Sequence, residues 1–162
     1  MIFSSRTTNN RVFSTLAIVF ISFVTPISNA KEYQSDAAPQ ITLGNGEKSW
    51  IIVDDLKRDE STLTFSEVNI DGAGFLVMHP FEDGKPNGDK YVASSYLKNG
   101  KNTNVDIKVH KGMSSGEPFI VMLHRDLNDN KVLDFVFVDD TNVMDKAVFE
   151  GSRMVAHIIK AP

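Results

Sequence analysis

Residues 99–109 read Asn99-Gly100-Lys101-Asn102-Thr103-Asn104-Val105-Asp106-Ile107-Lys108-Val109. The opening Asn-Gly pair is typical of a two-residue type I′ turn, because both central residues of that turn need a positive φ. The last five residues alternate apolar and polar side chains, as a strand with one buried face does. The stretch therefore predicts a β-hairpin whose second strand packs on a core.

The same kind of pattern recurs along the chain after residue 40. Short runs rich in β-branched and aromatic residues are separated by clusters of Gly, Asn, Asp and Pro that favour turns. No segment shows a 3.6-residue apolar stripe with helix caps. Besides 105–109, the expected strands are 49–53, 62–70, 74–79, 91–97, 117–124, 133–138 and 153–160. We therefore predict an all-β fold, an Ig-like β-sandwich of about seven or eight strands with little or no helix.

The alternation within the strands also predicts which side chains are buried. Ile52 and Ile158 are both expected in the core. In residues 62–70 the apolar positions change from odd to even numbers, which predicts a bulge or bend near residues 66–67.

The start of the chain has the pattern of an export signal. Two arginines precede an apolar run at residues 12–24, and residues 28–30 are small, as a signal peptidase requires. The apolar run is shorter than the roughly 20 residues of a membrane-spanning helix. We expect residues 1–30 to be a cleaved signal peptide, 31–40 a flexible tether and 41–162 one domain. The mature protein would then be periplasmic or extracellular, with no transmembrane segment.

Composition excludes several classes of function. None of the 21 acidic residues lies in the expected leader, so the mature chain is acidic, which argues against nucleic acid and anionic membranes as partners. The chain has no cysteine, which excludes disulfides, a cysteine nucleophile, a thiolate zinc site and a blue-copper centre. No serine-hydrolase elbow, zinc-protease motif or phosphate-binding glycine loop follows the leader. We therefore do not expect an enzyme, and the partner, a protein or a glycan, stays unidentified.

Three segments carry a family resemblance: residues 74–79, residues 96–109, and residues 122–130 followed by Asp134-Phe135. On these segments the chain resembles a family of secreted or cell-surface Ig-like β-sandwich domains of unknown function, common in haloarchaeal surface proteins and also found in bacteria. The third segment is the most specific one. Residues 139–144 depart from the Asp-Gly-Pro-Tyr segment that family members often have. The resemblance implies a sandwich and export, and it implies no activity.

Residues 126–134 lie between two apolar runs and carry oxygen-bearing side chains at alternate positions. Four of them stand at positions 1, 3, 5 and 9 of a twelve-residue calcium loop: Asp126, Asn128, Asn130 and Asp134. Position 6 is Lys131 instead of glycine, and position 12 is Phe137 instead of a bidentate glutamate. Further ligands could come from nearby carboxylates: Asp129, Asp139 or Asp140. The stretch fits either a weak calcium site that stabilises the fold or a metal-free turn held by side-chain-to-backbone hydrogen bonds.

His79 and His124 end two of the expected strands. If those strands were neighbours, the two imidazoles could approach each other and, with a methionine nearby, bind copper. The alternative is a pair of strand-end histidines that donate to loop carbonyls, because no His-x-His or His-x-x-x-His spacing is present.

The sequence therefore favours an exported, non-enzymatic β-sandwich module with a binding or structural role and calcium as its candidate ion. The alternative is a small periplasmic copper-handling protein that uses His79 and His124. Neither a reaction nor a ligand is identified.

Overall fold

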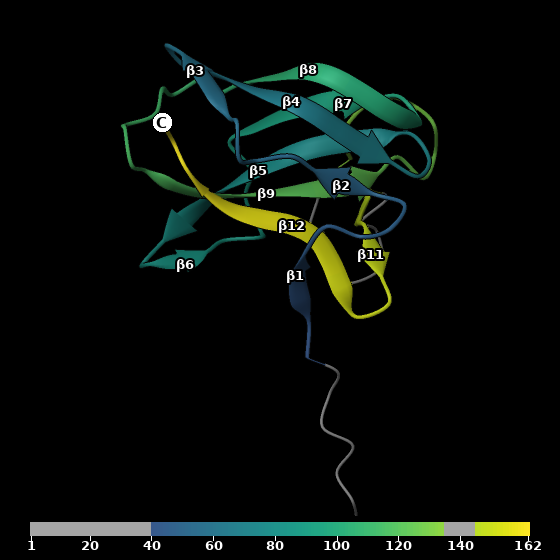
Figure 1. The fold of residues 1–162 in the computed structure, drawn as a ribbon. Helices are drawn as coiled ribbons and strands as arrows, with labels where there is room; N and C mark the ends of the chain where they lie inside the picture. The colour runs from purple at the N-terminus through teal and green to yellow at the C-terminus, as the bar shows by residue number, and fades with distance from the viewer. Residues whose placement is uncertain (1–39, 135–144) are drawn as a thin grey trace, which may run out of the picture. The chain divides into compact units, whose positions relative to one another are not determined.

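The fold is seen in a computed structural model that describes residues 40–134 and 145–162. The described residues form twelve strands and no helix, and the strands build two sheets that pack together (Figure 1). In chain order the strands are β1 (Thr42–Gly44), β2 (Trp50–Ile51), β3 (Lys57–Asp59), β4 (Thr62–Ile70), β5 (Gly74–Glu82), β6 (Lys85–Pro86), β7 (Ala93–Leu97), β8 (Gly100–Lys108), β9 (Pro118–Arg125), β10 (Lys146–Ala147), β11 (Phe149–Glu150) and β12 (Arg153–Lys160). The predicted all-β sandwich is confirmed. The strand number exceeds the prediction because half of these strands have only two or three residues.

Several sequence-based expectations fall outside the described residues. These are the signal peptide, all of the tether except Gln40, and residues 135–138 of the strand expected at 133–138. The described start of that segment, Leu133 and Asp134, is not in a strand. Among the described residues there is no helix with the length and hydropathy needed to cross a membrane.

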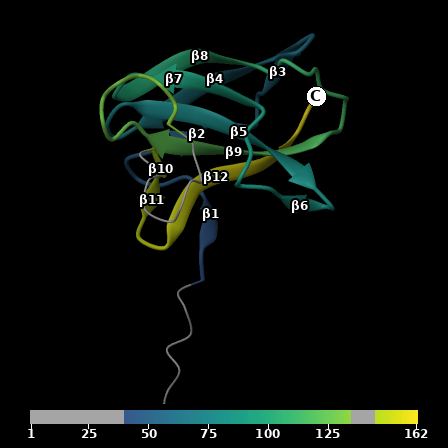
Figure 2. The ribbon, with the colours of Figure 1, turned by 180° about the vertical axis from the view of Figure 1, so that it is seen from behind.

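The larger sheet has the order β1-β12-β9-β5, and shorter strands pair with these: β6 and β7 with β5, β10 with β9, and β11 with β12. β10 and β11 are seen best from behind (Figure 2). β1 is parallel to β12, whereas the pairs β12–β9, β9–β5 and β5–β7 are antiparallel. In the smaller sheet β8 pairs with β4 along its whole length, and β2 and β3 pair with the two ends of β4.

The main core lies between the two sheets. Side chains alternate across a strand, so one face of β5 and one face of β9 turn toward β4 and β8. The largest buried side chains of this core include Phe65, Leu76, Met78, Ile107 and Phe119. Each contributes about 1.5–3 kcal/mol through removal from water, which explains how a chain without disulfides holds this fold.

β4 changes its buried phase in the middle, as the sequence predicts. Leu63 and Phe65 are buried before the change and Val68 and Ile70 after it. The register with β8 is the same on both sides of the change, so no residue is inserted. The partner strand absorbs the change at Asn104, whose φ is 50°. The phase change therefore coincides with a left-handed residue on β8 and not with an extra residue on β4.

Two core predictions, Ile52 and Ile158, are each one position away from the residue that is buried. Ile51 is fully buried and Ile52 only partly, because β2 ends at Ile51. On β12 the core residue is Ile159, whereas Ile158 is 56% exposed. Where two isoleucines are adjacent, either one could face the core, so the alternation of apolar and polar residues does not show which of the two is buried.

Candidate functional site

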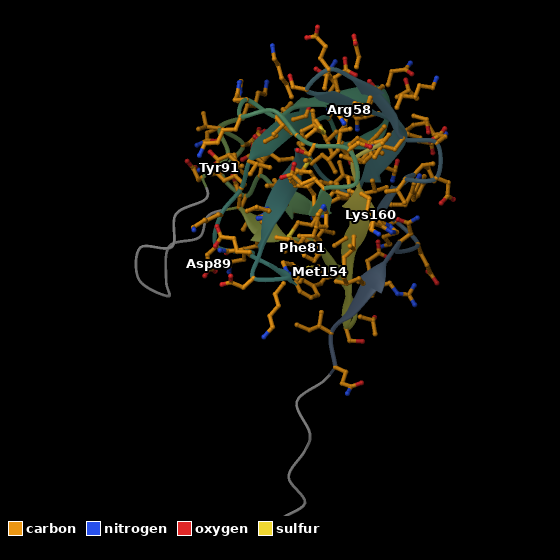
Figure 3. The ribbon with its side chains drawn as sticks, turned by 90° about the vertical axis from the view of Figure 1, so that its left-hand side faces the viewer. Arg58, Phe81, Asp89, Tyr91, Met154 and Lys160 are labelled. Carbon is orange, nitrogen blue, oxygen red and sulfur yellow. The ribbon has the colours of Figure 1, made fainter. Side chains whose placement is uncertain are left out.

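β5 and β9 are buried on both faces, and this second buried face holds the two histidines. Phe75, Val77 and His79 point away from the main core on β5, as do Met122 and His124 on β9. A small second cluster forms beside them on β9 and β12, from Ile120, Met122 and Ala156, with Phe81 and Met154 packed against it. Phe81 and Met154 are labelled near each other in Figure 3.

The structure brings His79 and His124 together on the neighbouring strands β5 and β9, although β5 continues to Glu82 and does not end at His79. Their ring centroids lie 5.6 Å apart with an interplanar angle of 34°. His124 pairs with Phe75 and His79 pairs with Ile120, so the two side chains lean toward each other along the strand pair. Both are buried.

In each ring, Nδ1 makes a hydrogen bond with a backbone carbonyl. His79 Nδ1 donates to the Lys90 oxygen at 2.6 Å, and His124 Nδ1 donates to the Asp145 oxygen at 3.0 Å. A carbonyl oxygen only accepts, so Nδ1 carries the hydrogen in both rings, and Nε2 is the acceptor nitrogen of each neutral ring. This is how metal-binding histidines are oriented in proteins, and it is also what a purely structural histidine does.

Burial keeps both imidazoles neutral. It lowers the pKa of His79, against the opposing effect of the Lys90 hydrogen bond. Burial likewise lowers the pKa of His124, to about 4; the Asp145 hydrogen bond opposes this shift and the neighbouring His79 adds to it. Neutral imidazole is the form that binds a metal ion.

The loop after β9 gathers the four residues that the sequence assigns to a calcium site. Asp126 is buried and accepts the N–H groups of Asn130 (3.3 Å) and Lys131 (2.9 Å). Asp134 Oδ2 accepts the side-chain amides of Asn128 and Asn130, both at 2.8 Å. Lys131 has a φ of 59°, so the left-handed turn at position 6 forms without glycine. Phe137, at position 12, lies outside the described residues.

Sequence reasoning missed Asp145, which lies at the base of this loop. Its side chain is fully buried, and its Oδ2 accepts the Asp134 N–H at 2.7 Å. Burial raises the pKa of Asp145; the N–H groups of Asp134 and Leu127 oppose this, and the carboxylates of Asp126 and Asp134 add to it. Two neighbouring carboxylates therefore act on Asp145. No spacing rule would have linked a residue eleven positions after Asp134 to the loop.

The sequence also suggested three other carboxylates as further ligands, and none of them is found beside the loop as Asp145 is within the described residues. Asp129 is exposed, and Asp139 and Asp140 lie outside the described residues. Asp145 also joins the two candidate sites, because its carbonyl holds His124 while its carboxylate holds the loop at Asp134.

Within residues 40–134 and 145–162, no three His, Asp or Glu side chains are already arranged around a common point as metal ligands. The loop oxygens are instead engaged by hydrogen bonds. Carboxylate and amide oxygens have two lone pairs, so an oxygen that accepts an N–H can also bind a cation.

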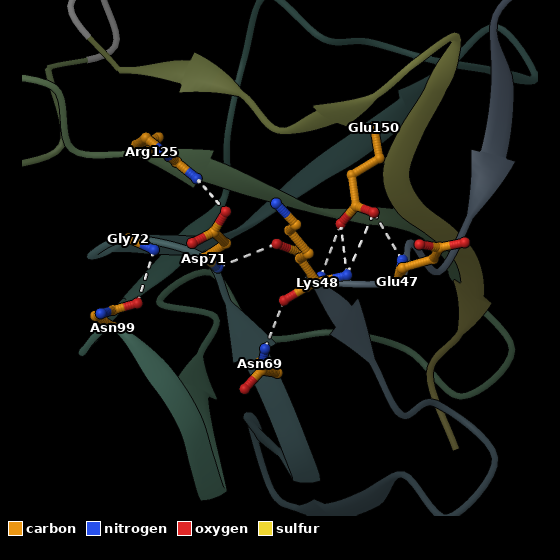
Figure 4. Close-up of polar contacts among 9 residues, drawn as sticks. Glu47, Lys48, Asn69, Asp71, Gly72, Asn99, Arg125 and Glu150 are labelled. Atoms are coloured by element: carbon orange, nitrogen blue, oxygen red, sulfur yellow. Dashed lines mark hydrogen bonds and ion pairs between the residues drawn. The ribbon is translucent and has the colours of Figure 1, made fainter.

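A second polar junction lies at the other side of β12. The Glu150 carboxylate accepts the backbone N–H groups of Glu47 (2.7 Å), Lys48 (3.0 Å) and Ser49 (2.8 Å) (Figure 4). Burial tends to raise the pKa of Glu150, but these three N–H groups outweigh it and the pKa lies below its ordinary value. This junction ties the segment between β1 and β2 to the β11–β12 turn and is already filled by the protein's own carboxylate.

Residues 50–159 match a family described as "Domain of unknown function (DUF7282)". The match runs from β2 into β12 and includes both candidate sites. No curated protein and no solved structure matches the chain.

Proposed function

This chain belongs to the DUF7282 family of domains of unknown function, and we propose that it is an exported, non-enzymatic β-sandwich module whose fold is stabilised by calcium. Its role is structural or binding, at the cell surface or in the periplasm, with a protein or a glycan as the partner.

The strand arrangement supports an Ig-like sandwich. β5, β9 and β12 form one sheet together with β7, and β4 and β8 form the other with β2 and β3. β4 and β8 thus share one sheet and β5, β9 and β12 the other, as strands B and E and strands C, F and G of Ig-like domains do. Loops of such a rigid sandwich are where recognition is usually located.

The loop at Asp126 is the observation that carries the calcium proposal. Asp126, Asn128, Asn130 and Asp134 supply hard oxygen atoms at the calcium-loop spacing, and the backbone already turns at Lys131 as such a loop must. The carboxylates of Asp126 and Asp134 repel the buried carboxylate of Asp145. A divalent cation would relieve that repulsion, so binding favours the folded state. Two carboxylates and two amides in the loop fit the weak, roughly millimolar sites of extracellular modules.

A thermal melt tests this proposal. The protein is melted in chelator and then in millimolar calcium, with the same concentration of magnesium as the control ion. A ligand that binds only the folded state raises the midpoint, so we expect a rise of a few degrees with calcium, which Asp126→Ala abolishes. An unchanged midpoint in calcium would refute the proposal.

The second candidate function is copper handling by the two histidines. Two imidazoles that share one ion at about 2.0–2.1 Å hold their centroids roughly 5–6 Å apart, which includes the observed 5.6 Å. Soft or borderline metals suit imidazole ligands. Titration with copper should then give one tight site per chain that is lost in His124→Asn; the absence of tight binding would remove this candidate.

A further inference from the structure

The calcium loop lacks the carboxylate that would close it from within. In a twelve-residue loop the last position supplies two oxygen atoms from one glutamate. Here that position is Phe137, an apolar side chain with no oxygen. Asp126 and Asp134 are the two carboxylates at the ligand positions, and the ion needs six to eight oxygen atoms. A further carboxylate has to come from outside the loop.

Asp145 is placed to supply it. Its carboxylate is held beside Asp134, because Oδ2 accepts the Asp134 N–H at 2.7 Å. The other oxygen, Oδ1, is buried and makes no hydrogen bond of ordinary geometry in the described part of the chain, although the Leu127 N–H acts on the same carboxylate. A buried carboxylate oxygen without a well-formed hydrogen bond is costly, and a cation at this point would satisfy it.

The charges around Asp145 also favour a bound cation. The carboxylates of Asp126 and Asp134 both act on it. Among the described residues the ion pairs lie elsewhere, at Lys90 with Glu82, Lys101 with Glu67, and Arg125 with Asp71. Three acidic side chains without a basic partner are stabilised by a divalent cation between them.

We propose that Asp145 is a calcium ligand that completes the Asp126–Asp134 loop from outside it. The inference rests on the proposed calcium binding. Asp126 directly follows β9 and Asp145 directly precedes β10, so the ion ties the end of one strand to the start of the next. Bound calcium therefore also holds the Asp145 carbonyl that accepts from His124.

Calcium titration by calorimetry tests the ligand assignment in the full protein with Asp145→Asn. Asparagine keeps one oxygen that can accept the Asp134 N–H, loses the charge and replaces the second oxygen by an NH2 group that does not bind a cation. We expect Asp145→Asn to weaken calcium binding at least tenfold while the midpoint in chelator stays the same or rises, because the repulsion has gone. The matched control is Asp129→Asn, which removes one charge from an exposed position of the same loop and should change the affinity less than twofold.

The outcomes separate the two proposals. If the wild type does not bind calcium, the proposed function fails and the ligand assignment fails with it. If the wild type binds and Asp126→Asn does not, whereas Asp145→Asn binds like the wild type, only the assignment of Asp145 is overturned. A measurement on the wild type does not depend on any variant folding: saturating calcium should shift the carboxyl carbon resonance of Asp145 and leave that of Asp129 in place. An unshifted Asp145 resonance in a calcium-bound protein would overturn the assignment.

Discussion

His79 and His124 lie with ring centroids 5.6 Å apart, both buried and both donating from Nδ1 to a backbone carbonyl. Two imidazoles in this arrangement are stable only in the neutral form, because a proton on either ring would place a charge in a buried site next to the other ring. The pair therefore makes the fold sensitive to acid, whether or not a metal binds there.

The free energy of unfolding should fall as the pH is lowered from about 6.5 to about 4. In the unfolded chain a histidine has its ordinary pKa near 6.5, and in the folded protein the pKa of His124 is about 4. Between these values the unfolded state binds the proton and the folded state does not, so acid favours unfolding. The contribution of His124 is fully present above pH 6.5 and amounts to about 3 kcal/mol. Urea denaturation at intervals of half a pH unit measures it.

The control for this prediction is His124→Asn, whose side-chain amide can still donate to the Asp145 carbonyl but does not titrate. Its stability should depend less steeply on pH in the same range. An identical slope in the variant and the wild type would show that other groups cause the acid sensitivity.

Gly74 is required where β5 meets β9. A Cβ at this position would overlap the His124 carbonyl oxygen and crowd the Arg125 backbone, and a strand backbone does not move aside easily. Gly74→Ala should therefore lower the free energy of unfolding by about 3 kcal/mol or more, as other severe backbone clashes do. Gly88→Ala is the matched control, since a Cβ there meets nothing within 4 Å. Equal midpoints for the two variants in a thermal melt would contradict the prediction.

The Glu150 carboxylate should contribute measurably to stability. It accepts three backbone N–H groups, from Glu47, Lys48 and Ser49, and removing it leaves them to water. We expect Glu150→Ala to lower the free energy of unfolding by about 1–2 kcal/mol. Glu47→Ala removes a neighbouring exposed carboxylate and keeps the backbone donor, so it should cost less than about 0.5 kcal/mol. Similar urea midpoints for the two variants would refute a special role for Glu150.

Strand positions were predicted well where alternation and turn chemistry agree. Residues 62–70 and 153–160 are strands with the predicted bounds, because turn residues lie just outside both. Errors arise where two apolar residues are adjacent, as at Ile158 and Ile159, since the face that is buried then depends on the neighbouring strand. Ile158 pairs with Ile120 on the face away from the main core, a relation that only the fold supplies.

For the candidate sites too, the sequence predicts local relations but not the contacts that depend on the fold. The four loop residues were found because they lie within nine positions of one another. Contact between His79 and His124 depends on the pairing of β5 with β9, which the sequence allowed without requiring. Asp145 carries no motif; its importance comes from burial and from the N–H of Asp134. Local ligands can be predicted from spacing, whereas a ligand brought by the fold cannot.

Lys131 stands at position 6 of the loop, where calcium loops usually have glycine. Its φ of 59° lies in the left-handed region, which costs a residue with a Cβ about 1–2 kcal/mol. Glycine would avoid this cost but would lose roughly 0.5–1 kcal/mol through the greater freedom of the unfolded chain. Lys131→Gly should therefore raise the free energy of unfolding in chelator by about 0.5–1 kcal/mol. Lys131→Ala removes the same charge and keeps the Cβ, so it should leave stability within about 0.5 kcal/mol of the wild type. Urea denaturation of the three proteins separates backbone conformation from charge: if alanine stabilises as much as glycine, the lysine charge and not its left-handed backbone is what limits the loop.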